Sequence, residues 1–188
     1  MEERRLFQRF PTLTNEDLLL HRIRTIDFDE FYELCSNEHL YQYRPTSAIT
    51  NRSVAYNLIT HYERDFAKQK ALCFGIFLRQ EQPHLIGLIE IYHIDKTGDT
   101  VTIGYTINEK FQNQGHATRA IHTTLDFLFH SIKVNRVQAY VLSENTSSTQ
   151  VLLKNGFSYE GTIREGMYLP SKGYFNMDLY SKLSREHK

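Results

Sequence analysis

The sequence predicts an α+β fold in which helices flank a mixed central sheet of about seven strands. Three apolar runs in the middle of the chain are separated only by short turns, which is typical of an antiparallel meander. A helix with a regular apolar stripe follows, and a short return leads from it into another strand. A strand, a helix and a strand joined in this way predict a parallel pair with a right-handed crossover.

Each strand is predicted from its apolar run, and each helix from the residues that precede it. We expect strands at residues 18–23, 72–78, 84–93, 100–107, 136–142, 157–164 and 174–181. We expect helices after Asp27, after Thr50 or Asn51, after Gly115 and after the polar stretch 143–148. Residues 1–16 are polar with two phenylalanines, and we expect an extended arm there.

The composition fits a single domain over residues 1–188. Lys plus Arg and Asp plus Glu both number 22, so the net charge is zero and a nucleic-acid partner is disfavoured. No run approaches the ~20 apolar residues of a membrane span, and the charged start is unlike a signal peptide. Cys35 and Cys73 form no Cys-x-x-Cys motif, so we expect no disulfide framework and a reducing, cytoplasmic setting.

The stretch Gly104–Ala120 is expected to start as a strand, turn through a polar loop and continue as a helix. Gln112-x-x-Gly115-x-Ala117 lies at the turn. Backbone N–H groups at the positive end of a helix form a seat for a phosphate or pyrophosphate. A P-loop is excluded because no Lys-Ser/Thr follows the glycine, and a dinucleotide-binding fingerprint because there is one glycine rather than three. An ordinary loop glycine stays the alternative.

Two further stretches carry a resemblance to a known family. They are Asn145-x-x-Ser148 with the following Leu153-Lys-Asn-Gly-Phe157, and Glu160-Gly-Thr-Ile-Arg164 with the Tyr-rich last strand. Together with the order of elements and the Gly115 loop, they resemble the GNAT superfamily of acetyl-CoA-dependent N-acetyltransferases over residues 16–182. Within it they are similar to the RimL/RimJ-type branch, which acetylates protein N termini, those of ribosomal proteins among them.

The resemblance implies the GNAT (acyl-CoA N-acyltransferase) fold and acetyl-CoA as co-substrate. It implies that the strand ending at Ile107 splays away from the strand ending near Leu142, and that the pantetheine lies between them. Thr106 and Ile107 would pair with the pantetheine, and Asn145 would bind its amide. The pyrophosphate would be bound by the loop residues Gln112, Asn113, Gln114, Gly115, His116, Ala117 and Thr118.

Attack of an amine on a thioester needs a base for the amine and a proton for the leaving thiolate. By resemblance Ser148 is the candidate proton donor, although Ser147 and Ser148 would also suit a helix N-cap. Glu90 lies mid-strand between apolar neighbours and is the candidate base, with a solvated sheet face as the alternative. Glu165 and Tyr168 are further acid–base candidates. Neither cysteine is placed as a nucleophile, so we expect direct transfer in a ternary complex.

The aromatic loop Leu40–Pro45 lies where the superfamily builds its acceptor groove. Tyr41, Tyr43 and Arg44 are candidates to clamp a peptide end, with ordinary aromatic packing as the alternative, and Pro45 is expected to break the chain's regular structure. An α-amino group with a pKa of ~7.8 is partly free at neutral pH, whereas a lysine at ~10.4 costs ~4–5 kcal/mol to deprotonate. We therefore expect a protein N-terminal α-amino group as acceptor, such as that of a ribosomal protein.

Other acceptors stay open, namely a small amine, a polyamine or an aminoglycoside. Glu38 and Glu165 are the only acidic residues in the loops 38–47 and 165–173 beside the expected groove, which argues against a polycation as acceptor. Asn176 stands where RimL-type chains usually carry an acidic residue, and Met167 near where some hold a catalytic carboxylate. A non-catalytic acetyl-CoA-binding module is the alternative outside enzymes.

No histidine follows a spacing such as His-Glu-x-x-His, so we expect no metal. A homodimer stays open, and no membrane partner is expected.

Overall fold

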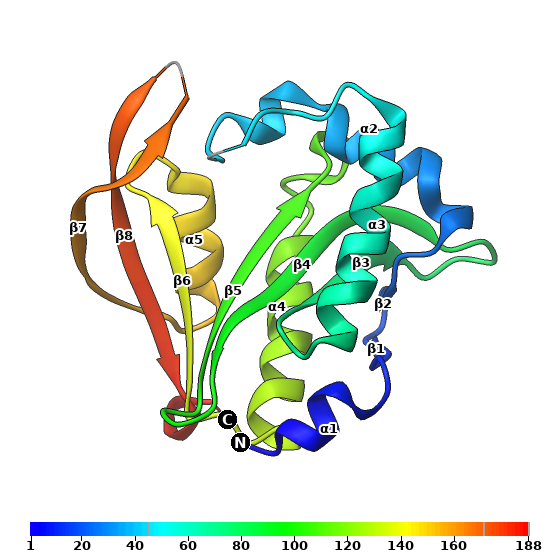
Figure 1. Ribbon diagram of the computed structural model, residues 1–188. Helices are drawn as coiled ribbons and strands as arrows, with labels where there is room; N and C mark the ends of the chain where they lie inside the picture. The colour runs from blue at the N-terminus through cyan, green and yellow to red at the C-terminus, as the bar shows by residue number, and fades with distance from the viewer. Residues whose placement is uncertain (45, 171, 188) are drawn as a thin grey trace.

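The computed structural model describes all residues except 45, 171 and 188, so the break expected at Pro45 lies outside the described residues. Its centre is an eight-stranded sheet in the order β1-β2-β3-β4-β5-β6-β8-β7 (Figure 1). The strands are β1 Leu13–Thr14, β2 Leu18–Arg22, β3 Leu72–Leu78, β4 His84–Asp95, β5 Thr100–Ile107, β6 Arg136–Leu142, β7 Ser158–Leu169 and β8 Gly173–Leu183. The helices are α1 Glu3–Gln8, α2 Phe28–Ser36, α3 Arg52–Ala67, α4 His116–Asp126 and α5 Thr146–Lys154. The predicted α+β class is confirmed.

Helices cover the sheet on both faces. On one face α4 and α5 contribute Ile121 and Leu152 to a large apolar core. On the other face Phe31 of α2 and Ile59 of α3 pack against Leu88 of β4. Because apolar side chains point to both sides of the central strands, those strands are almost continuously hydrophobic in sequence. Within the described residues, no helix is both long and apolar enough to cross a membrane.

The centre of the sheet contains its one described parallel pair. Strands β2 to β5 form an antiparallel meander, as predicted. β5 and β6 run parallel and pair only where residues 100–102 face residues 136–138. Beyond this point the described strands share no backbone pairing, and Figure 1 shows them diverging toward their C-terminal ends. The predicted crossover and the predicted splay are both confirmed.

The first residues form more structure than the extended arm expected over residues 1–16. The short helix α1 buries Leu6 completely and most of Phe7. The Phe7 ring lies 5.6 Å from the ring of Phe66 on α3, so this end of the chain is part of the core. A helix of six residues is too short to display a periodic apolar pattern, which is why the sequence did not predict it.

Two helix starts had been predicted from capping residues. Asn51 caps α3, because its side chain accepts a hydrogen bond from the Ser53 amide at 2.8 Å. Asp27 precedes α2 but makes no side-chain cap there. Its carboxylate instead accepts the Arg24 amide at 2.8 Å and closes the short turn before the helix. The side chain of Asp27 therefore does not cap α2, so this prediction is wrong, although the helix begins where predicted.

The last two strands form a longer hairpin than expected. β7 and β8 both extend beyond the strands predicted at 157–164 and 174–181. Their register shifts between Ile163 and Met167, and Glu165 adopts a positive φ of 53° within this bulge. A polar bulge resembles a loop in sequence, because it interrupts the alternation of apolar and polar residues that marks a strand.

Candidate active site

The loop before α4 presents unpaired amides at the open end of the sheet. Gly115 has φ 80° and ψ 0°, a left-handed conformation that glycine adopts without steric cost, and Asn113 has φ 60°. In the described chain, the N–H groups of residues 113–118 donate to no backbone or side-chain atom. The first turn of any helix leaves its amides without intrahelical partners, so this loop gathers them at the positive end of α4.

Gln112 shapes this loop instead of offering its amide. Its backbone N–H donates to the Glu109 carbonyl at 3.1 Å, and its side-chain Nε2 donates to the Ile107 carbonyl at 2.9 Å. The loop is thereby fixed to the end of β5. The phosphate-binding loop was expected to offer the amides of residues 112–118. The amide of Gln112 is already bonded, so the free amides are those of residues 113–118.

Arg119 holds this loop in place through a network of polar contacts. The Arg119 guanidinium donates to Asp17 Oδ1 at 3.0 Å and to the Gln114 carbonyl at 3.2 Å. Arg119 Nη2 also donates to Nδ1 of His116 at 2.9 Å, so that nitrogen is the acceptor of a neutral ring. Burial, and next the Arg119 charge, hold the pKa of His116 below its ordinary value. Nδ1 of His116 is therefore occupied within the protein.

A tyrosine side chain joins β5, one wall of the gap, to the start of α5. Tyr105 of β5 donates its hydroxyl to the Ser148 carbonyl of α5 at 3.0 Å. Burial raises the pKa of Tyr105 to about 12, so the phenol stays protonated and the bond persists at neutral pH. The sequence analysis missed this tyrosine, because the pairing links residues far apart in the chain and no local pattern marks it.

Backbone groups on successive residues of β5 point to opposite sides. The Thr106 carbonyl points at β4, because a Cβ built on Gly87 would lie 2.4 Å from it. The Asn108 amide likewise bonds the Ile86 carbonyl of β4 at 2.8 Å. The neighbouring groups on Tyr105 and Ile107 therefore point into the gap, where β6 no longer pairs with β5.

The N-terminus of α5 lies at the gap. Asn145 caps this helix, since its side-chain oxygen accepts the Ser148 amide at 3.2 Å. The alternative that Ser147 or Ser148 is the cap is therefore wrong. Ser148 is half-buried, and its hydroxyl has no hydrogen-bond partner within the described chain. Its proton is free for another role.

Glu90 reaches the gap from the α2–α3 side of the sheet. It is opposite Gly104 of β5, and its side chain is 28% exposed. Arg44 Nη2 lies 3.7 Å from Glu90 Oε2 and also donates to the Thr106 hydroxyl. The same guanidinium lies 5.5 Å from the centre of the Tyr41 ring. The loop that carries Arg44 and Tyr41 thus folds onto the middle of β4 and the end of β5, and its role as an acceptor groove stays a prediction.

The other residues predicted for the acceptor side are more exposed. Lys172, at the tip of the β7–β8 hairpin, donates to the Gln42 carbonyl at 3.3 Å, so the hairpin meets the loop before α3. Tyr168 of β7 is 56% exposed and lies 5.1 Å from Tyr174. The Glu165 amide is bound by the Asn176 side chain at 2.9 Å. Asn176 therefore shapes the bulge, and neither Glu165 nor Tyr168 is linked to Glu90 or Ser148.

The two cysteines are poor nucleophiles. Both are free and buried. Burial raises the pKa of Cys35 to about 11 and holds that of Cys73 well above its ordinary value. Since the thiolate is the reactive form, these side chains are protonated at neutral pH.

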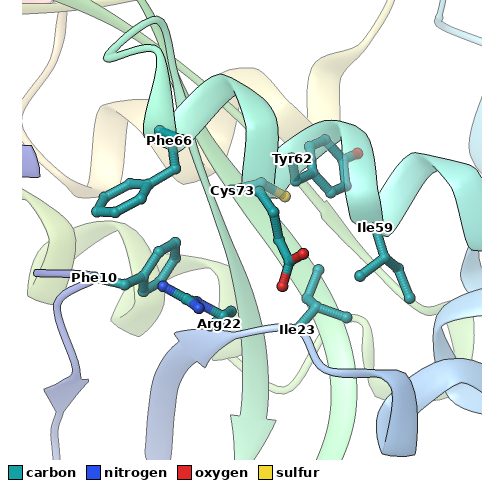
Figure 2. A pocket seen from close by; sticks show the side chains of 9 residues that line it. Phe10, Arg22, Ile23, Ile59, Tyr62, Phe66 and Cys73 are labelled. Atoms are coloured by element: carbon teal, nitrogen blue, oxygen red, sulfur yellow. The ribbon is translucent and has the colours of Figure 1, made fainter.

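A separate cavity of about 260 Å³ lies beneath α3 and is shown in Figure 2. Phe10 and Phe66 close one side of it, with Arg22 of β2 next to them. Tyr62 and Cys73 line the other side. Residues of β2 and β3 line this cavity, whereas the gap between β5 and β6 lies on the far side of β4. None of the predicted site residues lines the cavity.

A mixed sheet that splays at a central parallel pair, with a helix N-terminus at the opening, has the architecture of acyl-CoA N-acyltransferases. The family described as acetyltransferase (GNAT) domain matches residues 17–158. The chain therefore belongs to the GNAT acetyltransferase family. The predicted fold, family and enzyme class are confirmed.

Known proteins similar to this chain include acetyltransferases of different acceptors. The ribosomal-protein-serine acetyltransferase of Escherichia coli strain K12 is 28% identical over 177 residues, which cover 90% of this chain and 94% of that one. An acetyltransferase (GNAT family) from Bacillus anthracis has a TM-score of 0.82 at 24% identity, covering 94% and 100% of the two chains. The spermidine N-acetyltransferase from Vibrio cholerae, solved with CoA and spermine, has a TM-score of 0.79 at 20% identity, covering 92% and 99%.

Proposed function

We propose that the chain transfers the acetyl group of acetyl-CoA directly to a protein N-terminal α-amino group. The observation that carries this proposal is the gap between β5 and β6, with free amides at its opening and the Glu90 carboxylate on the acceptor side. The similarity to a ribosomal-protein-serine acetyltransferase supports a protein acceptor. We place the reaction in the cytoplasm, where two free buried cysteines stay reduced.

In the proposed complex the cofactor is bound mostly by backbone. The amides of residues 113–118 bind the pyrophosphate, and hydrogen bonds to a charged group contribute ~1.5–3 kcal/mol each. The backbone groups of Tyr105 and the Ile107 amide pair with the pantetheine as a neighbouring strand would, because the Ile107 carbonyl is already bound by Gln112 Nε2 and Thr106 faces β4. Asn145 uses its oxygen to cap α5, so its NH₂ group stays available for the pantetheine amide.

The chemistry is nucleophilic substitution at the thioester. The amine nitrogen attacks the carbonyl carbon, a C–N bond forms and the C–S bond breaks. Glu90 takes the proton from the amine, directly or through one water, and the Ser148 hydroxyl protonates the leaving thiolate and then recovers a proton from solvent. Ser148 approaches from the α5 side and Glu90 from the α2–α3 side, so the two groups serve opposite ends of the reacting centre.

The charges on the acceptor side are paired. The Arg44 guanidinium lies 3.7 Å from the Glu90 carboxylate and Lys110 lies 2.7 Å from Glu33, so neither pair adds net charge. A polyamine brings several positive charges, which an acidic groove would attract and these neutral pairs do not. An α-amino group is partly uncharged at neutral pH and needs no strong base. These two facts favour an N-terminal amine over spermidine.

The test is a mass-spectrometric assay of acetyl transfer at neutral pH. The substrates are a peptide with a free α-amine and one internal lysine, the same peptide with its α-amine blocked, and spermidine. We expect kcat/KM for the free α-amine to exceed that of the other two by about tenfold or more, since their amines are largely protonated. Equal or faster acetylation of the blocked peptide or of spermidine would contradict the proposed acceptor.

The role of Ser148 has its own test, with its neighbour as control. We expect Ser148→Ala to lower turnover by about tenfold or more, because the thiolate loses its proton donor. Coenzyme A affinity, measured by calorimetry, should be unchanged, and Ser147→Ala, at an exposed neighbouring position, should leave both quantities unchanged. Unchanged turnover in Ser148→Ala removes it from the mechanism. If acetyl-CoA binds and no amine is acetylated, the chain is a non-catalytic binding module.

A further inference from the structure

The far end of α4 carries a cluster of histidines around one carboxylate. His122, Asp126 and His130 follow one another at four-residue intervals, so the helix places them on one face. His122 Nδ1 lies 3.2 Å from Asp126 Oδ2, and His130 Nδ1 lies 4.0 Å from Asp126 Oδ1. The π-helical turn Phe127–Ser131 follows Asp126 and carries His130.

A third histidine reaches the same carboxylate from the end of the chain. His187 Nε2 lies 2.6 Å from Asp126 Oδ1, and its ring centre is 5.3 Å from that of His130 and 5.7 Å from that of His122. One ligand atom from each of Asp126, His130 and His187 lies within 4.8 Å of the others. Three residues from two distant segments therefore converge on one point.

The His187 side chain is only 2% exposed, which is unusual for a histidine near a chain end. Its Nδ1 has no hydrogen-bond partner in the described chain, so the Asp126 carboxylate is the polar anchor of the ring. The Phe129 ring, 5.1 Å away, covers it. The ring is thus held with Nε2 directed at the carboxylate, while His130 and His122 remain open to solvent at 60% exposure.

We propose that Asp126, His130 and His187 bind a divalent transition-metal ion, with His122 or water as the fourth ligand. Imidazole nitrogens with one carboxylate suit Zn²⁺ and its neighbours, and exclude a preference for Mg²⁺ or Ca²⁺. Bonds of ~2.0–2.1 Å to a tetrahedral ion place ligand atoms roughly 3.3 Å apart, so the ion needs small side-chain shifts from the distances observed. The metal replaces the hydrogen now shared by His187 and Asp126.

This site lies outside the acetyl-transfer machinery. It is at the C-terminal end of α4, whereas the free amides are at the N-terminal end. Its effect is to fasten the last residues of the chain to α4. The expectation of no metal rested on the absence of His-Glu-x-x-His, a spacing that covers neither histidines eight residues apart nor one supplied by a distant segment.

The test is calorimetric titration of the untagged, chelator-treated full chain with Zn²⁺, with Mg²⁺ as the control ion. We expect one Zn²⁺ per chain, no Mg²⁺ binding, and about tenfold or greater loss of Zn²⁺ affinity in His130→Ala. His61→Ala is the matched control, because His61 is as exposed as His130 and pairs with Asp65 on α3 at 3.2 Å, with no third ligand among the described residues. It should bind Zn²⁺ as the unmodified chain does.

A second readout reports the coordination geometry of the bound ion directly. Co²⁺ bound by a tetrahedral nitrogen and oxygen site absorbs strongly in the visible range, and octahedral surface-bound Co²⁺ does not. We expect this absorption in the unmodified chain and in His61→Ala, and its loss in His130→Ala, whose exposed position leaves the core intact. Equal Zn²⁺ affinity in the unmodified chain and His130→Ala, or the absence of the Co²⁺ band, overturns the proposal.

Discussion

The proposed donor side and the proposed acceptor side of the gap are built by different means. The donor side consists of main-chain groups: the amides of residues 113–118 and the unpaired edge of β5. The acceptor side consists of side chains, and Glu90, Arg44 and Tyr41 come from a strand and a loop distant from it in sequence. A main-chain site depends on backbone conformation and tolerates many side chains. A side-chain site changes with each substitution, so one fold can keep its donor and vary its acceptor.

The largest expected effect comes from breaking the acceptor side alone. Glu90→Gln keeps the shape of the side chain and removes its basicity, so we expect kcat to fall by about 100-fold. Coenzyme A affinity, measured by calorimetry, should stay unchanged, because Glu90 faces away from the free amides. Glu63→Gln, on the exposed side of α3, is the control and should keep full turnover. A Glu90→Gln enzyme with normal kcat would show that the base lies elsewhere.

Breaking the donor side should show the opposite pattern. In Gly115→Ala, the new Cβ lies in a left-handed backbone position and 2.7 Å from Arg119 Nη1, so the loop and its amides must shift. We expect coenzyme A to bind about tenfold more weakly, the loss of one charged hydrogen bond. Gly156→Ala introduces the same strain at φ 76° beyond the end of α5. If Gly115→Ala and Gly156→Ala weaken coenzyme A binding equally, backbone strain explains the loss, and the amides of residues 113–118 have no specific role in binding.

The smallest effect should come from the side chain that links the two halves. Tyr105→Phe removes the hydroxyl that bonds the Ser148 carbonyl, and we expect a loss of about 1 kcal/mol in the free energy of unfolding. Turnover should fall only a few-fold, because the Ser148 hydroxyl remains and is merely less well positioned. Urea unfolding and steady-state kinetics measure the two effects. Tyr56→Phe, at an exposed tyrosine of α3, should change neither, and a similar loss there would remove the special role of Tyr105.

The sequence predicted the loop of free amides well because its signals are local. Gly115 lies between a strand and a helix that both show clear periodicity, and the free amides follow from that junction. Asn51 was placed correctly for the same reason, since a cap is defined by its immediate neighbours. The crossover between β5 and β6 was predictable because parallel strands joined by one helix take a single hand.

The acceptor side could be predicted only in outline because its contacts are long-range. Arg44 meets Thr106 and Glu90 across a loop with no periodic pattern. The support of the donor loop by Asp17 was missed in the same way, since Asp17 and Arg119 are separated by most of the domain. Such pairs are fixed by tertiary packing, and propensity and periodicity carry no information about them.

The short pairing of β5 with β6 gives the protein two strand edges in the interior of its sheet. Unpaired strand edges expose N–H and C=O groups with which other chains can pair. Most proteins therefore keep such edges short, place charged side chains on them or cover them. In this chain the proposed pantetheine would be the cover. Bound cofactor would then protect the enzyme from self-association, and the splay that makes room for the reaction would also make solubility depend on the cofactor supply.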